Sequence, residues 1–111
     1  MATEQFPTSR VLSMDQEVEY SDNSIVSRQV IKDSGGNVSL FAFDAGQELS
    51  EHTAPFDALI QVIDGNAKIF IAGLEYSLEK GNSIIMPANI PHAVKAEERF
   101  KMLLTMIRKP E

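Results

Sequence analysis

The chain has 111 residues, of which 43% are apolar and 23% are charged, as expected of one globular domain. Cysteine is absent, which excludes a disulfide scaffold, a thiolate metal cluster and a cysteine nucleophile. The net charge is −6, from 10 Lys and Arg against 16 Asp and Glu. No apolar stretch approaches the roughly 18 residues of a membrane span, and the first residues lack a signal-peptide pattern. We therefore expect a cytoplasmic protein with no membrane partner.

Nucleic acid is not expected as a partner either. The nearest basic cluster is formed by Lys95, Arg99 and Lys101, and Glu97 and Glu98 interrupt it. Binding to phosphates needs a continuous basic stripe that releases counterions. We interpret this cluster as a solvated turn between two strands.

Residues 1–27 are predicted to form an N-terminal arm. Its few apolar anchors stand among acids and serines: Phe6, Val11, Leu12, Met14, Val18 and Ile25. Such a segment can pack along a sheet edge, of its own chain or of a second copy, and cover unpaired backbone groups. A homodimer is therefore one expectation. Residues 13–20 fit a capped helix or a strand equally well, and the pattern leaves this open.

The rest of the chain is predicted to be all-β. Short runs rich in β-branched and aromatic residues cover 37–43, 57–63, 67–72, 83–86 and 100–107. Turn signals recur about every ten residues, which is the spacing of a sandwich or barrel. An Asp-Gly step at Asp64-Gly65 separates the second and third runs, and this step is typical of a tight hairpin turn. We therefore expect these two strands to pair antiparallel.

Two segments around the two histidines resemble the motifs of a known family. The first runs from Gly46 to Gly65, with His52 after five intervening residues. The second runs from Gly81 to His92, with five residues before Pro87. These segments resemble the first and second motifs of the cupin family, and the fifteen residues between them are typical of small cupins. The likeness is dense over 46–92 and extends over 28–108.

The resemblance implies a jelly-roll barrel, also called a double-stranded β-helix, of six to eight strands over residues 28–108. His52 and His92 would then point into the lumen from facing strands. Pro91 fixes its own φ and can start the strand that carries His92. Asn89 stands where the family pattern has Gly, and Asn tolerates left-handed backbone best after Gly.

The family's metal ligands are only half present. Metal-binding cupins have a second His and a Glu at the positions of Ala54 and Ala58. Two imidazoles provide half of a tetrahedral site and no negative charge, so we expect a divalent transition metal (Fe, Ni, Mn or Zn) to bind weakly or not at all. If residues 48–52 are extended, Glu48 shares a face with His52 and becomes the most reasonable carboxylate ligand.

The two alanines also leave space in the lumen. Strand alternation puts residues 58, 60 and 62 on the inner face and directs Asp57 and Gln61 away from it. The predicted ligand-binding residues are His52, Ala54, Phe56, Asp57, Ala58, Ile60, Val62, His92 and Met102. Phe56 is a candidate lid, and Asp57 could line the mouth, pair with a histidine or stabilise a turn. Apolar walls with two polar groups are typical of a small-molecule pocket.

These observations favour a small cupin that binds a small organic ligand near His52 and His92, with a depleted metal site. The alternative is a metal-dependent enzyme of the oxygenase or isomerase type that uses both histidines and a carboxylate. A metal-free acid/base catalyst of the sugar-epimerase kind would need a buried carboxylate beside a histidine, which the sequence does not place. The sensory half of a transcription regulator lacks support because no helix-turn-helix segment is predicted. Whether the chain is an enzyme stays open.

Overall fold

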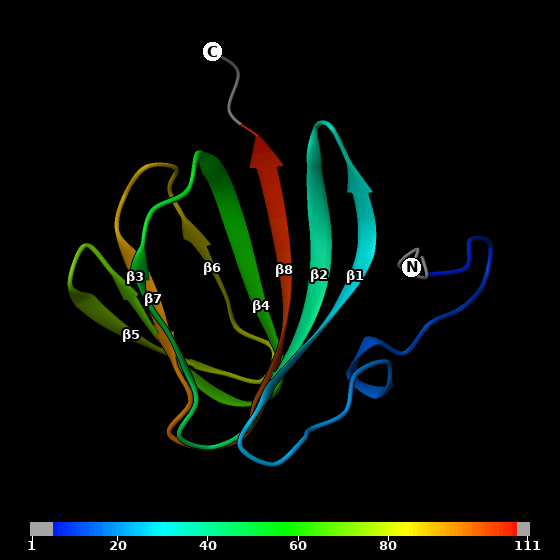
Figure 1. Ribbon diagram of the computed structural model, residues 1–111, viewed down its shortest axis with the longest axis horizontal. Helices are drawn as coiled ribbons and strands as arrows, with labels where there is room; N and C mark the ends of the chain where they lie inside the picture. Colours follow the sequence, from blue (N-terminus) through cyan, green and yellow to red (C-terminus); the bar gives the residue numbers. More distant parts are fainter. Residues whose placement is uncertain (1–5, 109–111) are drawn as a thin grey trace.

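The computed structural model describes residues 6–108, which are almost entirely β-structure (Figure 1). A short 3-10 helix, η1 (Met14–Gln16), precedes the strands. The eight strands in this part of the chain are β1 (Ile25–Asp33), β2 (Gly36–Phe43), β3 (Glu48–His52), β4 (Phe56–Ile71), β5 (Leu74–Glu79), β6 (Ser83–Met86), β7 (His92–Lys95) and β8 (Phe100–Arg108). Within residues 6–108, no helix has the length and apolar character needed to cross a membrane.

The strands form two antiparallel sheets that share β4. The first sheet has the order β1-β2-β8-β4-β6, and the second has the order β5-β4-β7-β3. The two sheets face each other across a common lumen (Figure 1). Residues 56–65 of β4 pair with β8, whereas residues 66–71 pair with β5 in the other sheet. The all-β prediction is confirmed, and the runs at 37–43, 83–86 and 100–107 correspond to β2, β6 and β8.

The predicted hairpin at Asp64-Gly65 is wrong. Both flanking runs belong to the single 16-residue strand β4, which bends at a register shift between Val62 and Asp64. Gly65 has φ +71° there, and a Cβ on it would lie 2.1 Å from the carbonyl oxygen of Arg99. A bulge uses left-handed glycine as a hairpin does, so the same dipeptide fits both. Because of the shift, the buried positions change from 58, 60 and 62 to 67 and 69.

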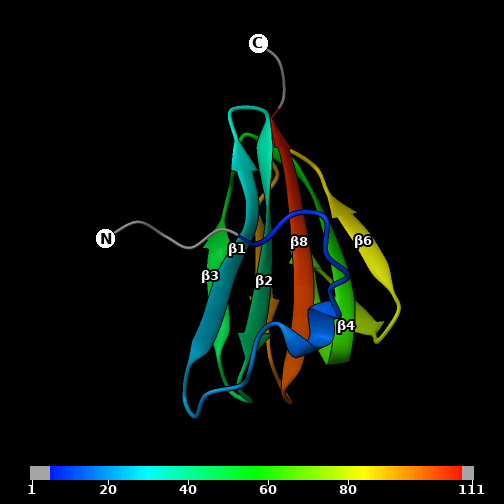
Figure 2. The same cartoon turned by 90° about the vertical axis from the view of Figure 1, so that its right-hand side faces the viewer.

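Two apolar clusters stabilise the fold, one on each side of the first sheet. The lumen holds the stacked rings of Phe43 and Phe100, whose centroids are 4.5 Å apart. On the outer face of this sheet, Phe6 and Val18 pack with Leu40. Figure 2 shows the segment before β1 crossing this face. The first described residues thus cover a sheet face of their own chain.

Polar contacts hold this segment in place. The Tyr20 hydroxyl donates to Asp64 Oδ2 at 2.5 Å, and Arg99 donates to Asp22 and Asp44 at 2.9 and 2.7 Å. The undecided region 13–20 contains η1, and Ser13 at its start makes no side-chain capping bond. Sheet structure begins at Ile25, inside the range that the sequence assigned to the arm.

Candidate functional site

A cavity lies in the lumen between the first half of β4 and strands β3 and β7. Its volume is about 60 Å³. Its lining is apolar except for two histidines, and consists of Leu49, His52, Ala54, Phe56, Ala58, Ile60, Met86, His92, Val94, Met102, Leu104 and Met106. Pockets for drug-sized ligands measure about 300–1,000 Å³, so this one accepts a much smaller guest.

The structure brings the two predicted histidines together in the wall of this cavity. His52 is the last residue of β3 and His92 the first of β7, and the two are register partners. Their Nε2 atoms are 3.1 Å apart, and the ring planes meet at 70°. His92 is 7% exposed, whereas His52 is solvent-exposed.

A backbone carbonyl lies within hydrogen-bond distance of Nδ1 in both rings. His52 Nδ1 lies 2.7 Å from the Ser50 carbonyl oxygen, and His92 Nδ1 lies 3.2 Å from that of Ile90. A carbonyl oxygen accepts hydrogen bonds but cannot donate, so these two contacts favour a hydrogen on Nδ1. The hydrogen bond between the two Nε2 atoms requires a hydrogen on one of them as well. Burial lowers the pKa of His92 and the nearby His52 lowers it further, while the Ile90 contact acts in the opposite direction.

A network of hydrogen bonds positions the loop that precedes His92. The backbone N–H groups of Ala88 and Asn89 donate to Asp57 Oδ1 at 2.9 Å and to the Ala54 carbonyl at 2.8 Å. Asn89 has φ +63°, which confirms the left-handed backbone expected there. Asp57 thus has the turn-stabilising role among those considered, and it does not line the cavity.

Two other predicted residues also lie away from the cavity. Val62 is 1% exposed and belongs to the lumen core, but it does not line the cavity. Glu48 was expected beside His52, and this is wrong: its carboxylate lies 3.9 Å from Lys95 Nζ on an exposed surface. The reason is a register shift in β3 between Leu49 and His52. Because of this bulge, Leu49 rather than Glu48 lines the cavity with His52.

Most of the predicted lining residues are in place. His52, Ala54, Phe56, Ala58, Ile60, His92 and Met102 all line the cavity. Phe56 also carries the Arg108 guanidinium over its ring, 5.0 Å from the centroid. The sequence analysis did not place five further lining residues at the site: Leu49, Met86, Val94, Leu104 and Met106. Regular alternation in β7 and β8 would have indicated Val94, Leu104 and Met106.

The histidine pair meets part of the requirement for a metal. Nitrogens bound to one ion at about 2.0–2.1 Å lie about 2.9 Å apart at a right angle and about 3.3 Å apart at the tetrahedral angle. The observed 3.1 Å is compatible with two neighbouring ligand positions. However, no group of three His, Cys, Asp or Glu gathers within residues 6–108, and the other lining residues are apolar. The donor set therefore does not fit a resident metal centre.

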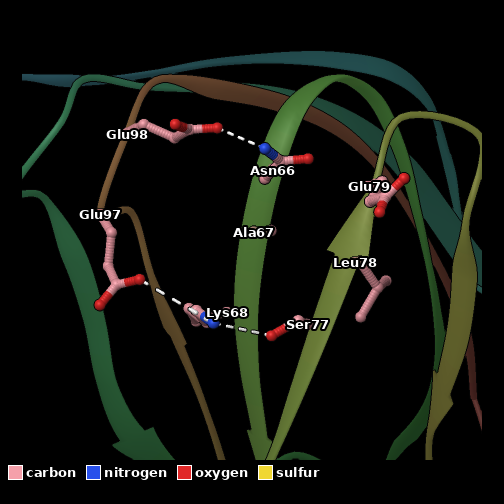
Figure 3. Close-up of a pocket in the computed structure, with 8 residues that line it drawn as sticks. All are labelled: Asn66, Ala67, Lys68, Ser77, Leu78, Glu79, Glu97 and Glu98. Carbon is pink, nitrogen blue, oxygen red and sulfur yellow. Dashed lines mark hydrogen bonds and ion pairs between the residues drawn. The ribbon is translucent and has the colours of Figure 1, made fainter.

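A second and larger hollow, of about 330 Å³, lies at the other half of β4 (Figure 3). We call it the polar cleft; it is lined by Asn66, Ala67, Lys68, Ser77, Leu78, Glu79, Glu97 and Glu98. Its polar side chains contact one another. Lys68 Nζ donates to Ser77 Oγ at 2.7 Å and lies 3.9 Å from Glu97, and Asn66 donates to Glu98. The polar side chains of the cleft therefore have partners within the protein and do not need a ligand to satisfy them.

Comparison with known proteins identifies the family. The sequence profile of the cupin domain matches residues 39–107, so the chain belongs to the cupin family. The resemblance and the jelly-roll cupin fold are thereby confirmed. A search of curated proteins finds no significant match.

Solved structures with the same fold support this assignment. A conserved protein of unknown function from Streptococcus pyogenes is 33% identical with a TM-score of 0.91, over 100% of this chain and 98% of that one. A cupin superfamily protein from Desulfitobacterium hafniense is 26% identical with a TM-score of 0.88, over 98% and 100%. A cupin 2 conserved barrel domain protein from Leptotrichia buccalis is 41% identical with a TM-score of 0.83, over 85% of this chain and 46% of that one.

Proposed function

We propose that this cupin binds a small organic molecule in the lumen cavity, next to His52 and His92. The observation that carries the proposal is the composition of the cavity: apolar walls and two imidazole side chains in contact with each other. Apolar surfaces with a few converging hydrogen-bonding groups are typical of small-molecule sites. The two alanines at the family's metal-ligand positions, Ala54 and Ala58, both line the cavity and leave its walls free of charge.

The cavity itself is tested with a guest that has no head group. Xenon enters dry apolar cavities of proteins. With ¹³C-methyl-labelled methionine, we expect xenon pressure to shift the methyl signals of Met86, Met102 and Met106, which line the cavity. Met14 lies in the outer cluster and is the internal control. The variant Ala58→Leu places a larger side chain in the cavity and should abolish the shifts. Unchanged signals of all three lining methionines in the wild type would refute the proposal.

A metal-dependent enzyme is the second candidate, and the 3.1 Å separation of the Nε2 atoms favours it. Metal content of the untagged protein, measured by mass spectrometry, separates the two candidates. We expect well below one metal ion per chain. About one ion per chain in the wild type, lost in both His52→Ala and His92→Ala, would contradict the metal-depleted pocket and favour the metal-dependent candidate instead.

Two further sequence predictions become proposals here. We propose that the chain forms a homodimer, although the described part of its N-terminal arm packs on its own sheet, and that it is cytoplasmic, as its composition suggests. Sedimentation equilibrium measures the first, since a dimer has twice the mass of the chain. Fractionation of cells measures the second.

A further inference from the structure

We infer that the ligand of the lumen cavity carries a carboxylate, which pairs with Arg108 at the rim of the barrel while an apolar tail occupies the cavity. This inference rests on the proposed function and specifies the chemical class of the ligand. Three features support it: the position of Arg108 next to the cavity, the contacts of its guanidinium group, and the uncharged lining of the cavity.

Arg108 continues the inward-facing side of β8 beyond the cavity. Met102, Leu104 and Met106 line the cavity from this strand. Every second residue of a strand faces the same side, so Arg108 is the next residue in this row. Its register partner on β4 is Phe56, another lining residue, and the guanidinium carbon lies 5.0 Å from the centroid of the Phe56 ring. Figure 1 shows β4 beginning and β8 ending at the same edge of the barrel, so Arg108 lies at the rim beside the cavity.

The guanidinium group of Arg108 has no carboxylate partner within residues 6–108, unlike two comparable arginines. Arg28, Arg99 and Arg108 each lie over an aromatic ring. Arg28 and Arg99 also form ion pairs with carboxylates, at 3.3 and 2.7 Å. Arg108 instead donates from Nε to the carbonyl oxygen of Ser34 at 3.3 Å. The position that a carboxylate fills beside the other two arginines is thus available to a ligand beside Arg108.

The contacts of Arg108 suit it to hold a carboxylate. Its backbone N–H donates to the Gly35 carbonyl at 3.0 Å, and the Ser34 carbonyl and the Phe56 ring hold its side chain. The terminal nitrogens of a guanidinium form a planar fork that matches a carboxylate in a bidentate pair. Arg108 is also solvent-exposed, so a ligand can reach it from outside the barrel.

The cavity lining determines the orientation of such a ligand. No Lys, Arg, Asp or Glu lines the cavity, and burying an unpaired charge there would be very costly. The carboxylate therefore stays at the rim, and the apolar part points inward. A cavity of about 150 Å³ holds benzene, so about 60 Å³ is enough for two or three carbon atoms of the tail. The ligand class is therefore a short-chain carboxylic acid in its ionised form.

Two probes with the same number of heavy atoms test the inference: pentanoate, which carries the charge, and pentanamide, its neutral analogue. Each is titrated at about pH 8, where carboxylates are ionised, into protein with ¹³C-methyl methionine. The shifts of Met86, Met102 and Met106 report binding, and Met14 is the control. We expect pentanoate to bind about fivefold or more tightly than pentanamide, because hydrogen bonds to charged groups are stronger. Raising the salt concentration from about 20 mM to about 500 mM should reduce this ratio, since salt screens exposed charges.

Variants assign the preference to Arg108. Arg108→Gln removes the charge and should bring the ratio between pentanoate and pentanamide close to one. Arg108→Lys keeps the charge without the planar fork and should give an intermediate ratio. Lys80→Gln is the matched control, because it removes the same charge in the turn between β5 and β6 and should leave the ratio unchanged.

The outcomes separate this inference from the proposed function. Pentanamide binding as tightly as pentanoate would overturn the carboxylate ligand and leave a binding cavity. A preference for pentanoate that persists in Arg108→Gln would overturn the role of Arg108. Failure of pentanoate to shift the lining methionines while xenon does would also overturn the inference. If neither xenon nor any probe shifts these signals, the proposed function fails as well.

Discussion

The two halves of β4 line two hollows of opposite character. The first half contributes Ala58 and Ile60 to an apolar cavity of about 60 Å³ whose lining includes the exposed His52. The second half contributes Asn66 and Lys68 to a polar cleft of about 330 Å³ (Figure 3). The larger hollow is the less suitable binding site, because its polar groups already contact one another.

The comparison shows that the chemistry of the lining matters more for ligand binding than the volume of the hollow. In the cleft, a ligand would have to displace hydrogen bonds and ion pairs in contact with water, which yields little net free energy. In the cavity, apolar walls gain from contact with an apolar guest, and the Nε2 atoms supply direction. The predictions below test this difference between the two halves of one strand, beginning with the largest expected effect.

Truncating a side chain in the first half of β4 should lower the free energy of unfolding most. Ile60 has no exposed surface and lies in both the lumen core and the cavity wall. Ile60→Ala should lower the free energy of unfolding by about 2–5 kcal/mol, because the lost contacts and the enlarged cavity add up. Urea denaturation measures the change. A loss below about 1 kcal/mol would show that the lumen collapses around the gap and is not rigid.

Substitution at the junction between the halves should cost somewhat less. Gly65→Ala forces a side chain into left-handed backbone and against the Arg99 carbonyl oxygen. We expect a loss of about 1–3 kcal/mol in the same urea experiment. Gly73→Ala is the matched control, since Gly73 also has positive φ but nothing lies within 4 Å of a Cβ there. Equal losses at both sites would mean that the contact with Arg99 does not matter.

Acid should lower the stability of the folded protein through His92, which lines the cavity. Burial lowers the pKa of His92 in the folded protein below its ordinary value of 6.5, so the unfolded chain binds more protons as the pH falls. The contribution of His92 to stability is therefore complete above about pH 6.5 and is lost as the pH falls toward the lower folded pKa.

Urea midpoints at pH 8 and pH 5.5 measure this effect, and the wild type should be less stable at pH 5.5. His92→Gln, which does not titrate, should show a smaller decrease between the two values. An equal decrease in both proteins would assign the pH dependence to other groups.

The smallest effect is expected in the polar cleft. Lys68 contacts Ser77, Glu75 and Glu97 at a partly exposed position. Lys68→Ala should change the free energy of unfolding by at most about 1 kcal/mol, since exposed ion pairs contribute little. It should also leave the xenon-induced shifts of the lining methionines unchanged. A loss comparable to that of Ile60→Ala would contradict the contrast between the two hollows.

Much of the site could be predicted from local patterns. Alternation in 57–63 correctly placed Ala58 and Ile60 on the inner face, and the left-handed backbone at Asn89 followed from the residue type. The predictions of Glu48 beside His52 and of a hairpin at Gly65 were wrong for the same reason. Each error lies at a register shift, and one inserted residue moves every following side chain to the other face.

The sequence by itself determined the β class, most of the strands and the two histidines in cupin-like motifs, because residue type and short-range spacing control these features. The tertiary structure decided that β4 crosses between sheets, that the first described residues cover an outer sheet face, and that the two imidazoles meet in the wall of one cavity. These features depend on contacts between residues far apart in the chain, such as Gly65 with Arg99 and His52 with His92. Such contacts exist only after the sheets have paired, so no local pattern encodes them.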